Sequence, residues 1–173
     1  MSAQYPSSGG IGRYLELLKT RVDQLSALLC IVIVGSMTLL VTYQVVARYL
    51  FNSPSAVSEV LSRYLFIWLV LIGGAYVFGS REHMAITFMR DRFSRKVRLV
   101  LEMVGELVTL LFALAVMVFG GWHGMSRQMA QLDSALQIPM GYIYAAIPVS
   151  GAIIVFYWLY NQTQLVRQWR QAE

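Results

Sequence analysis

Four long stretches without a charged residue dominate this chain, and each is close to the length that a helix needs to cross a bilayer. They are residues 24–47, 64–80, 107–126 and 134–166. A transmembrane helix takes about 20 predominantly apolar residues. We therefore predict an all-α integral membrane protein with four transmembrane helices, at approximately 24–48, 58–80, 99–124 and 138–162. Gly73 and Gly74 in the second span permit close helix contacts, and Pro148 predicts a kink inside the fourth.

Composition leaves little of the chain for anything outside the membrane. Of its 173 residues, 57% are hydrophobic and only 13% are charged, so much of the surface should face lipid rather than water. Four spans with short connections use most of this length, which excludes a large extramembrane enzyme domain. Cys30 is the only cysteine, so disulfide frameworks and thiolate metal clusters are excluded as well.

The residues before the first span differ in pattern from the rest. Residues 1–10, rich in Ser and Gly, predict a disordered tail. Residues 11–23 place apolar side chains on one helical face and charged ones on the other, which predicts an amphipathic helix in the membrane interface. This helix would be a membrane-surface anchor or, alternatively, a partner-binding helix. Residues 11–173 then form a single membrane domain.

The basic residues are distributed unevenly around the four spans. Of the 14 lysines and arginines, 11 lie before the first span, between the second and third, or after the fourth. Cytoplasmic loops carry the excess of Lys and Arg. We therefore predict that both termini and the basic loop 81–98 are cytoplasmic. This segregation explains the net charge of +5 through contact with membrane lipids, without nucleic acid as a partner.

Three charged residues near the outer ends of the first two spans are candidates for a cluster. Glu59 and Arg63 are four apart on one helical face, and the short connection after the first span could bring Arg48 beside them. Ion pairs at helix ends commonly orient neighbouring helices, so we expect a structural charge cluster or subunit interface that locks the helical hairpin. Contact with a partner, a substrate or a lipid phosphate is the alternative.

Glu106 is the acid that could lie within a span. If the third helix enters the membrane near Arg98, the Glu106 carboxyl is a candidate proton or cation site; if it enters near Leu107, the carboxyl is interfacial. Both alternatives stay open. Asp133 stands alone in the outer loop, with no acid partner nearby.

Motifs for catalysis and cofactor binding are absent from the sequence. His83 falls at the cytoplasmic end of the second span and His123 at the outer end of the third, so they lie on opposite sides of the membrane and cannot be the two axial ligands of one membrane haem. There is no nucleophile elbow, no His-Glu-x-x-His pair and no phosphate-binding glycine loop. The sequence therefore predicts a protein that is not an enzyme and that binds no cofactor or metal ion itself.

Two segments, taken together, resemble a known family. The first runs from Glu59 through Ser62-Arg63-Tyr64-Leu65, Trp68 and Gly73-Gly74-Ala75 to Arg81-Glu82-His83-Met84, and the second from Asp133-Ser134 through Pro139 to Pro148. On these residues the chain resembles the DctQ family, the small membrane subunits of tripartite ATP-independent periplasmic (TRAP) transporters. The family-motif positions are Trp68, Gly73, Gly74, Arg81 and His83.

The resemblance implies a complex of three proteins in a bacterial inner membrane. A periplasmic binding protein would deliver an organic acid to a large permease subunit, which would carry the substrate and sodium sites. The small subunit would be a scaffold for the large one, and Arg48, Arg63 and Arg127 would help to dock the binding protein. The competing interpretation is a free-standing four-helix exporter that exchanges protons at Glu106.

Overall fold

The computed structural model describes residues 10–79 and 95–170, and most of them are helical. The helices are α1 (Gly10–Tyr49), α2 (Ala56–Gly79), α4 (Arg95–Phe112), the π-helix η1 (Ala113–Gly120), α5 (Gly121–Gln128), α6 (Gly141–Tyr144) and α7 (Ala146–Arg170). Four segments are long and apolar enough to cross a membrane: Tyr14–Tyr49, Ala56–Gly79, Met103–Gln128 and Gly141–Gln162. The predicted all-α membrane class with four spans is confirmed.

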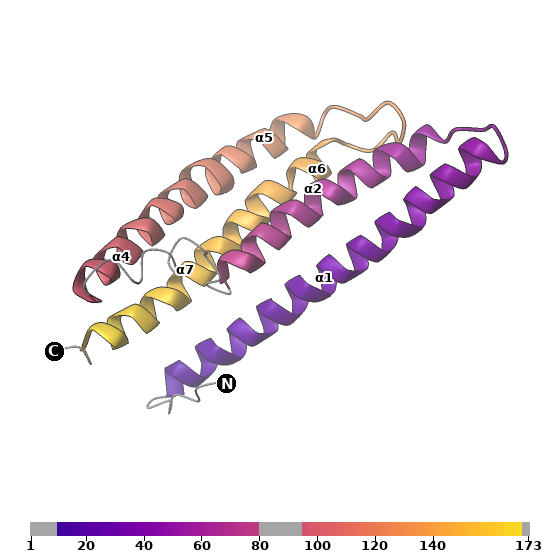
Figure 1. Ribbon diagram of the computed structural model, residues 1–173. Coiled ribbons are helices and arrows are strands. Elements are labelled where there is room, and N and C mark those ends of the chain that lie inside the picture. The colour runs from indigo at the N-terminus through magenta and orange to yellow at the C-terminus, as the bar shows by residue number, and fades with distance from the viewer. Residues whose placement is uncertain (1–9, 80–94, 171–173) are drawn as a thin grey trace.

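The four crossings run side by side (Figure 1). α1 packs on α2, α2 packs on α7, and α7 packs on η1. The turn between α1 and α2 and the loop between α5 and α6 lie at one end of the bundle, which we call the loop end. The Gly10 end of α1 and the Arg170 end of α7 lie at the other, which we call the terminal end.

The bundle has an apolar outer surface and several polar side chains inside. Leu39 is 74% exposed and Phe119 is 67% exposed, whereas Ser26, Ser150 and Asn161 are buried. Large apolar side chains spread over the surface would be unfavourable in water, but lipid chains solvate them well. The distribution of side chains therefore fits a protein surrounded by a bilayer.

α1 is one unbroken helix of 40 residues, which differs from the predicted division into an interfacial helix at 11–23 and a span at 24–48. Residues 20–27 contain neither Gly nor Pro, so no residue there favours ending the helix. At about 1.5 Å per residue, a helix of this length reaches about 60 Å, roughly twice the hydrocarbon thickness of a bilayer. The amphipathic segment is thus the continuation of the first span.

The third crossing contains a π-helix that the sequence did not predict, and it continues to Gln128, beyond the predicted end at 124. Ala113 and Met117 of η1 are buried. Gly151 of α7 packs closely there, since a Cβ atom at Gly151 would lie 2.7 Å from the Met117 Cβ. Only a residue without a side chain allows this approach of α7 to η1.

The last crossing is divided at Ala145, one turn before Pro148. A proline ring clashes with the carbonyl group four residues earlier, so a regular helix cannot run through this position. The kink expected at Pro148 takes the form of this break. α6 begins at Gly141 rather than at 138, because Pro139 belongs to the preceding loop, where it forms an isolated bridge with Leu132.

Several predictions fall on residues outside the described ranges. These are the tail 1–10 except for Gly10, the basic loop 81–98 except for its last four residues, and the motif positions Arg81 and His83.

Candidate functional site

Gln44 joins α1 to α2 near the turn between them. Its side-chain Nε2 donates hydrogen bonds to the Ser58 carbonyl at 2.9 Å and to the Ser62 hydroxyl oxygen at 2.7 Å. Ser62 in turn donates to the Ser58 carbonyl at 2.8 Å. Sequence reasoning overlooked this cluster, although an amide within an apolar run, facing two serines one turn apart, was a signal for it.

The three charged residues predicted to lock this hairpin lie near it, but only two of them pair. Arg63 Nη2 lies 3.5 Å from Glu59 Oε1, and both side chains are more than half exposed. Arg48 is in the last turn of α1, and in the described part of the chain no ion pair joins it to Glu59. An exposed pair four residues apart contributes about 0.3–0.5 kcal/mol. The Gln44 hydrogen bonds are therefore the main polar link of the hairpin.

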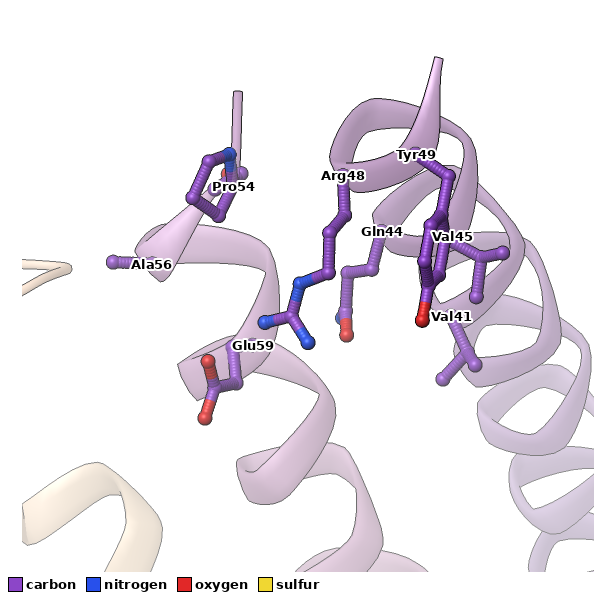
Figure 2. Close-up of a pocket in the computed structure, with 9 residues that line it drawn as sticks. Val41, Gln44, Val45, Arg48, Tyr49, Pro54, Ala56 and Glu59 are labelled. Atoms are coloured by element: carbon purple, nitrogen blue, oxygen red, sulfur yellow. The ribbon is translucent and has the colours of Figure 1, made fainter. Parts of the chain in front are cut away.

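Arg48 and Glu59 line a cleft at the loop end. The cleft has a volume of about 470 Å³ and is lined by Val41, Gln44, Val45, Arg48, Tyr49, Pro54, Ser55, Ala56 and Glu59. Figure 2 shows the Arg48 guanidinium pointing across the cleft towards the Glu59 side, with Val45 and Val41 on the preceding turns of α1. The cleft thus combines a charged rim with an apolar wall.

Asp133 anchors the loop between α5 and α6. Its Oδ1 accepts hydrogen bonds from the backbone N–H groups of Ala135, at 2.8 Å, and Leu136, at 2.9 Å, while its Oδ2 accepts the Tyr64 hydroxyl of α2. The Tyr64 hydrogen bond, followed by the Leu136 N–H, lowers the pKa of the Asp133 carboxyl below its ordinary value. The acid that stood alone in the sequence is a buried loop anchor.

The same loop closes on itself through backbone hydrogen bonds. The Asp133 N–H donates to the Ile138 carbonyl at 2.9 Å, and the Met140 N–H donates to the Gln131 carbonyl at 2.8 Å. Gln137 has a φ of 55°, in the left-handed region that turns use. These bonds give the loop end a defined surface.

The three arginines predicted to dock a binding protein have different surroundings at this end. Arg63 is exposed, and Arg127 is exposed in the last turn of α5. Arg48, also exposed, points across the cleft (Figure 2). All three arginines are therefore exposed at this end, and of the three only Arg48 lines the cleft.

Asp23 joins α1 to α7 towards the terminal end. Lys19 Nζ donates to Asp23 Oδ2 at 2.6 Å, and the fully buried Tyr157 hydroxyl donates to Asp23 Oδ1 at 2.6 Å. The Lys19 ammonium also lies 5.6 Å from the centre of the Tyr160 ring. The polar face of the amphipathic segment thus packs on α7, while Leu18 on the apolar face is exposed.

Glu106 takes part in a contact between helices. Its Oε2 accepts a hydrogen bond from Gln162 Nε2 of α7 at 3.0 Å. Glu106 lies in the first turn of the candidate span Met103–Gln128, and Gln162 ends the span Gly141–Gln162. The carboxylate is therefore near the end of the crossings rather than at their middle.

Among the residues that the structure describes, no other helix approaches Gly73 or Gly74 closely, contrary to expectation. A Cβ atom at Gly73 would lie 3.9 Å from Cys30 Sγ, and one at Gly74 would have no atom within 4 Å. Gly74 is exposed, while Trp68 is half-buried. Close approaches occur instead at Gly79, Gly121 and Gly151.

A second, apolar groove lies one turn from Gly74, between α2 and the α6–α7 segment. Its volume is about 470 Å³, and it is lined by Tyr64, Phe66, Ile67, Val70, Leu71, Met140, Ile143, Tyr144 and Ile147. Phe66 and Val70 are more than half exposed. The groove is open to lipid or to another membrane helix.

Metal ligands do not gather in the part of the chain that the structure describes. No group of three or more His, Cys, Asp or Glu side chains there could hold a metal ion. The ring Nδ1 of His123 lies 3.3 Å from the Phe119 carbonyl, one turn back on the same crossing.

Known proteins similar to this chain are membrane components of transporters. The family described as "Tripartite ATP-independent periplasmic transporters, DctQ component" matches residues 37–170. The sialic acid TRAP transporter small permease protein SiaQ of Vibrio cholerae is 29% identical over 142 residues, covering 82% of each chain. The C4-dicarboxylate TRAP transporter small permease protein DctQ of the same species is 22% identical over 167 residues, covering 83% of this chain and 72% of the relative.

A longer relative contains a similar segment as one part of its sequence. The sialic acid TRAP transporter permease protein SiaT of Haemophilus influenzae is 26% identical over 122 residues. These cover 69% of this chain but only 19% of that protein.

Proposed function

We propose a function for this chain on the basis of its family. It belongs to the DctQ components of tripartite ATP-independent periplasmic (TRAP) transporters. It is a multi-pass membrane protein, its role is that of a TRAP small permease subunit, and it is not an enzyme. In the proposed complex it is the scaffold of a large permease subunit in a bacterial inner membrane. The large subunit imports an organic acid together with sodium, after a periplasmic binding protein delivers the acid.

The extent of the family match is the observation that carries the proposal. Residues 37–170 include three whole crossings and the loop-end part of the first, so the likeness extends over most of the bundle. The relative SiaT supports a physical association with a larger permease, because a segment like this chain is there joined to further sequence in one polypeptide. The names of the relatives, a sialic acid and a C4-dicarboxylate transporter, support an organic acid as substrate.

A scaffold role agrees with the use that this chain makes of its acids near the membrane. Asp23 is bonded to Lys19 and Tyr157, and Glu106 accepts a hydrogen bond from Gln162. The Tyr157 contact ties α7 to α1, and the Gln162 contact ties α7 to α4. The family membership and these contacts favour a structural role over a free-standing proton-coupled exporter, and we place sodium binding in the large subunit.

We assign the contact with the large subunit to the groove between α2 and the α6–α7 segment. Phe66 and Val70 expose apolar surface there, and Gly74 leaves room for a close approach one turn further on. Membrane helices associate through small residues and complementary packing, because lipid offers no hydrophobic driving force between them. A helix of the large subunit is the occupant that this surface suits.

The loop end faces the periplasm in this proposal, and both termini are cytoplasmic. The excess of Lys and Arg in the sequence before the first crossing, between the second and third and after the fourth supports this orientation. The exposed Arg63 and Arg127 then lie on the periplasmic side, where they can contact the binding protein. Complementary charge on that protein would speed its association.

Co-purification tests the proposal. The tagged chain should be co-expressed with a large TRAP permease subunit from the same organism and extracted in a mild detergent. We expect one stable complex of the two subunits. The proposal is wrong if the chain elutes alone and, in liposomes without partners, exports a substrate in a proton-dependent manner that Glu106→Gln abolishes.

A further inference from the structure

The cleft between α1 and α2 is apolar at one end and charged at the other. Val41 and Val45 form an apolar wall on two successive turns of α1, and both side chains are about half exposed. Arg48 and Tyr49 follow on the last turn, at the end of the candidate span Tyr14–Tyr49. The cleft therefore changes from apolar to charged along the same axis as one leaflet of a bilayer.

At the charged rim of the cleft, a cationic and an anionic side chain both have hydrogen-bonding groups that no described residue uses. In the described residues Arg48 makes no hydrogen bond or ion pair, and its guanidinium points across the cleft (Figure 2). Glu59 uses only Oε1 in its 3.5 Å contact with Arg63. A guanidinium binds phosphate through paired hydrogen bonds, and a carboxylate oxygen accepts from an ammonium group.

We propose that this cleft binds a phospholipid whose headgroup carries both a phosphodiester and a primary ammonium group. The phosphodiester binds the Arg48 guanidinium, the ammonium binds Glu59, and one acyl chain lies along Val45 and Val41. Free phosphate would leave the apolar wall unused, whereas a lipid satisfies the wall and the rim together. The inference requires only that the chain spans a membrane, so it stands independently of the proposed partner subunits.

Native mass spectrometry of the purified full chain tests this site. The probes are phosphatidylethanolamine, phosphatidylglycerol with the same acyl chains, and inorganic phosphate. Wild type should retain one phosphatidylethanolamine in preference to phosphatidylglycerol. Arg48→Gln should weaken retention about tenfold, the loss expected for a charge-assisted contact. Glu59→Gln should abolish the preference between the two lipids while binding persists.

Two further variants separate the lipid from other occupants. Val45→Trp fills the apolar wall and should weaken lipid retention while both charges remain. Arg127→Gln, at the same end of the bundle but outside the cleft, is the matched control and should retain lipid as wild type does. Helical content measured by circular dichroism should be equal in all variants.

Three results would overturn the proposal. Lipid retention unchanged in both Arg48→Gln and Val45→Trp would exclude a phospholipid from the cleft. Displacement of the lipid by inorganic phosphate, with Val45→Trp binding phosphate normally, would assign the site to free phosphate. Unchanged lipid retention in Arg48→Gln, combined with loss of the co-purifying large subunit, would assign the cleft to the subunit interface.

Discussion

The Tyr64 hydroxyl donates a hydrogen bond to the Asp133 carboxylate, joining two positions that are 69 residues apart in the chain. Tyr64 belongs to the Ser62-Arg63-Tyr64 segment of α2, and Asp133 opens the second segment on which the family resemblance rests. The two segments therefore meet at the loop end. Their contact fixes the α5–α6 loop over α2 and shapes the surface on which we place the binding protein.

Removing the Tyr64 hydroxyl should destabilise the protein. Tyr64→Phe deletes a hydrogen bond to a charged acceptor, and we expect a loss of about 1 kcal/mol, because the loop end is near water. Thermal unfolding in detergent measures the loss. Tyr142→Phe is the control, since Tyr142 is exposed and its hydroxyl makes no hydrogen bond in the described residues. Equal effects of the two substitutions would contradict the assigned role of Tyr64.

The Asp133 carboxylate should make stability depend on pH in acid. Because its pKa in the folded protein is lowered, chiefly by Tyr64, the unfolded chain takes up the proton more readily. The stabilisation is complete above the ordinary Asp pKa of about 3.9 and is lost as pH falls through the lower folded value. Wild type should therefore exceed Asp133→Asn in melting temperature at neutral pH. That advantage should shrink below about pH 4, and a constant difference would refute the prediction.

A methyl group at Gly151 should separate α7 from the π-helix. Its Cβ would lie 2.7 Å from the Met117 Cβ and 3.3 Å from the Val118 backbone nitrogen, neither of which can move alone. We expect Gly151→Ala to cost about 1–3 kcal/mol, as overpacking does. Gly105→Ala meets open space in α4 and should instead stabilise by about 0.5–1 kcal/mol. Opposite signs in thermal unfolding are the expected result, and two changes of the same sign would contradict it.

The spans could be predicted from the sequence because they depend on one strong signal. Uncharged runs such as 107–126 need no tertiary information, since the bilayer is the common solvent for all four helices. The predicted helix boundary between residues 23 and 24 is wrong, because a change from an amphipathic to an apolar pattern does not itself end a helix. A Gly or a Pro would favour ending the helix, and neither stands at residues 20–27.

The contacts that organise the candidate site could not be predicted in the same way. Asp133 and Tyr64 are brought together by the packing of separate helices, which hydropathy does not encode. Their charge made Arg48 and Glu59 the predicted link between α1 and α2. The uncharged Gln44 makes the hydrogen bonds between these two helices instead. In a low-dielectric surrounding an amide is cheaper to bury than an ion, so it is the more natural link between helices.

A bulky side chain at Gly74 should disrupt assembly without affecting the isolated chain. A Cβ atom at the exposed Gly74 would meet no described atom within 4 Å, so the thermal unfolding of Gly74→Phe should match wild type. If the large subunit packs on this face of α2, co-purification should fall at least about tenfold, as for a misfit at a packed interface. Gly105→Phe, on α4 at an exposed glycine whose Cβ atom would also meet no described atom within 4 Å, should leave co-purification intact. Normal assembly of Gly74→Phe would place the large subunit elsewhere.

Uptake by reconstituted liposomes tests the scaffold role most directly. The large subunit, the binding protein and a sodium gradient should be supplied with and without this chain, and this chain should also be tested alone. We predict organic acid uptake only when both membrane subunits are present, and none by this chain alone. Sodium-driven uptake by this chain alone, or full uptake in its absence, would contradict that role.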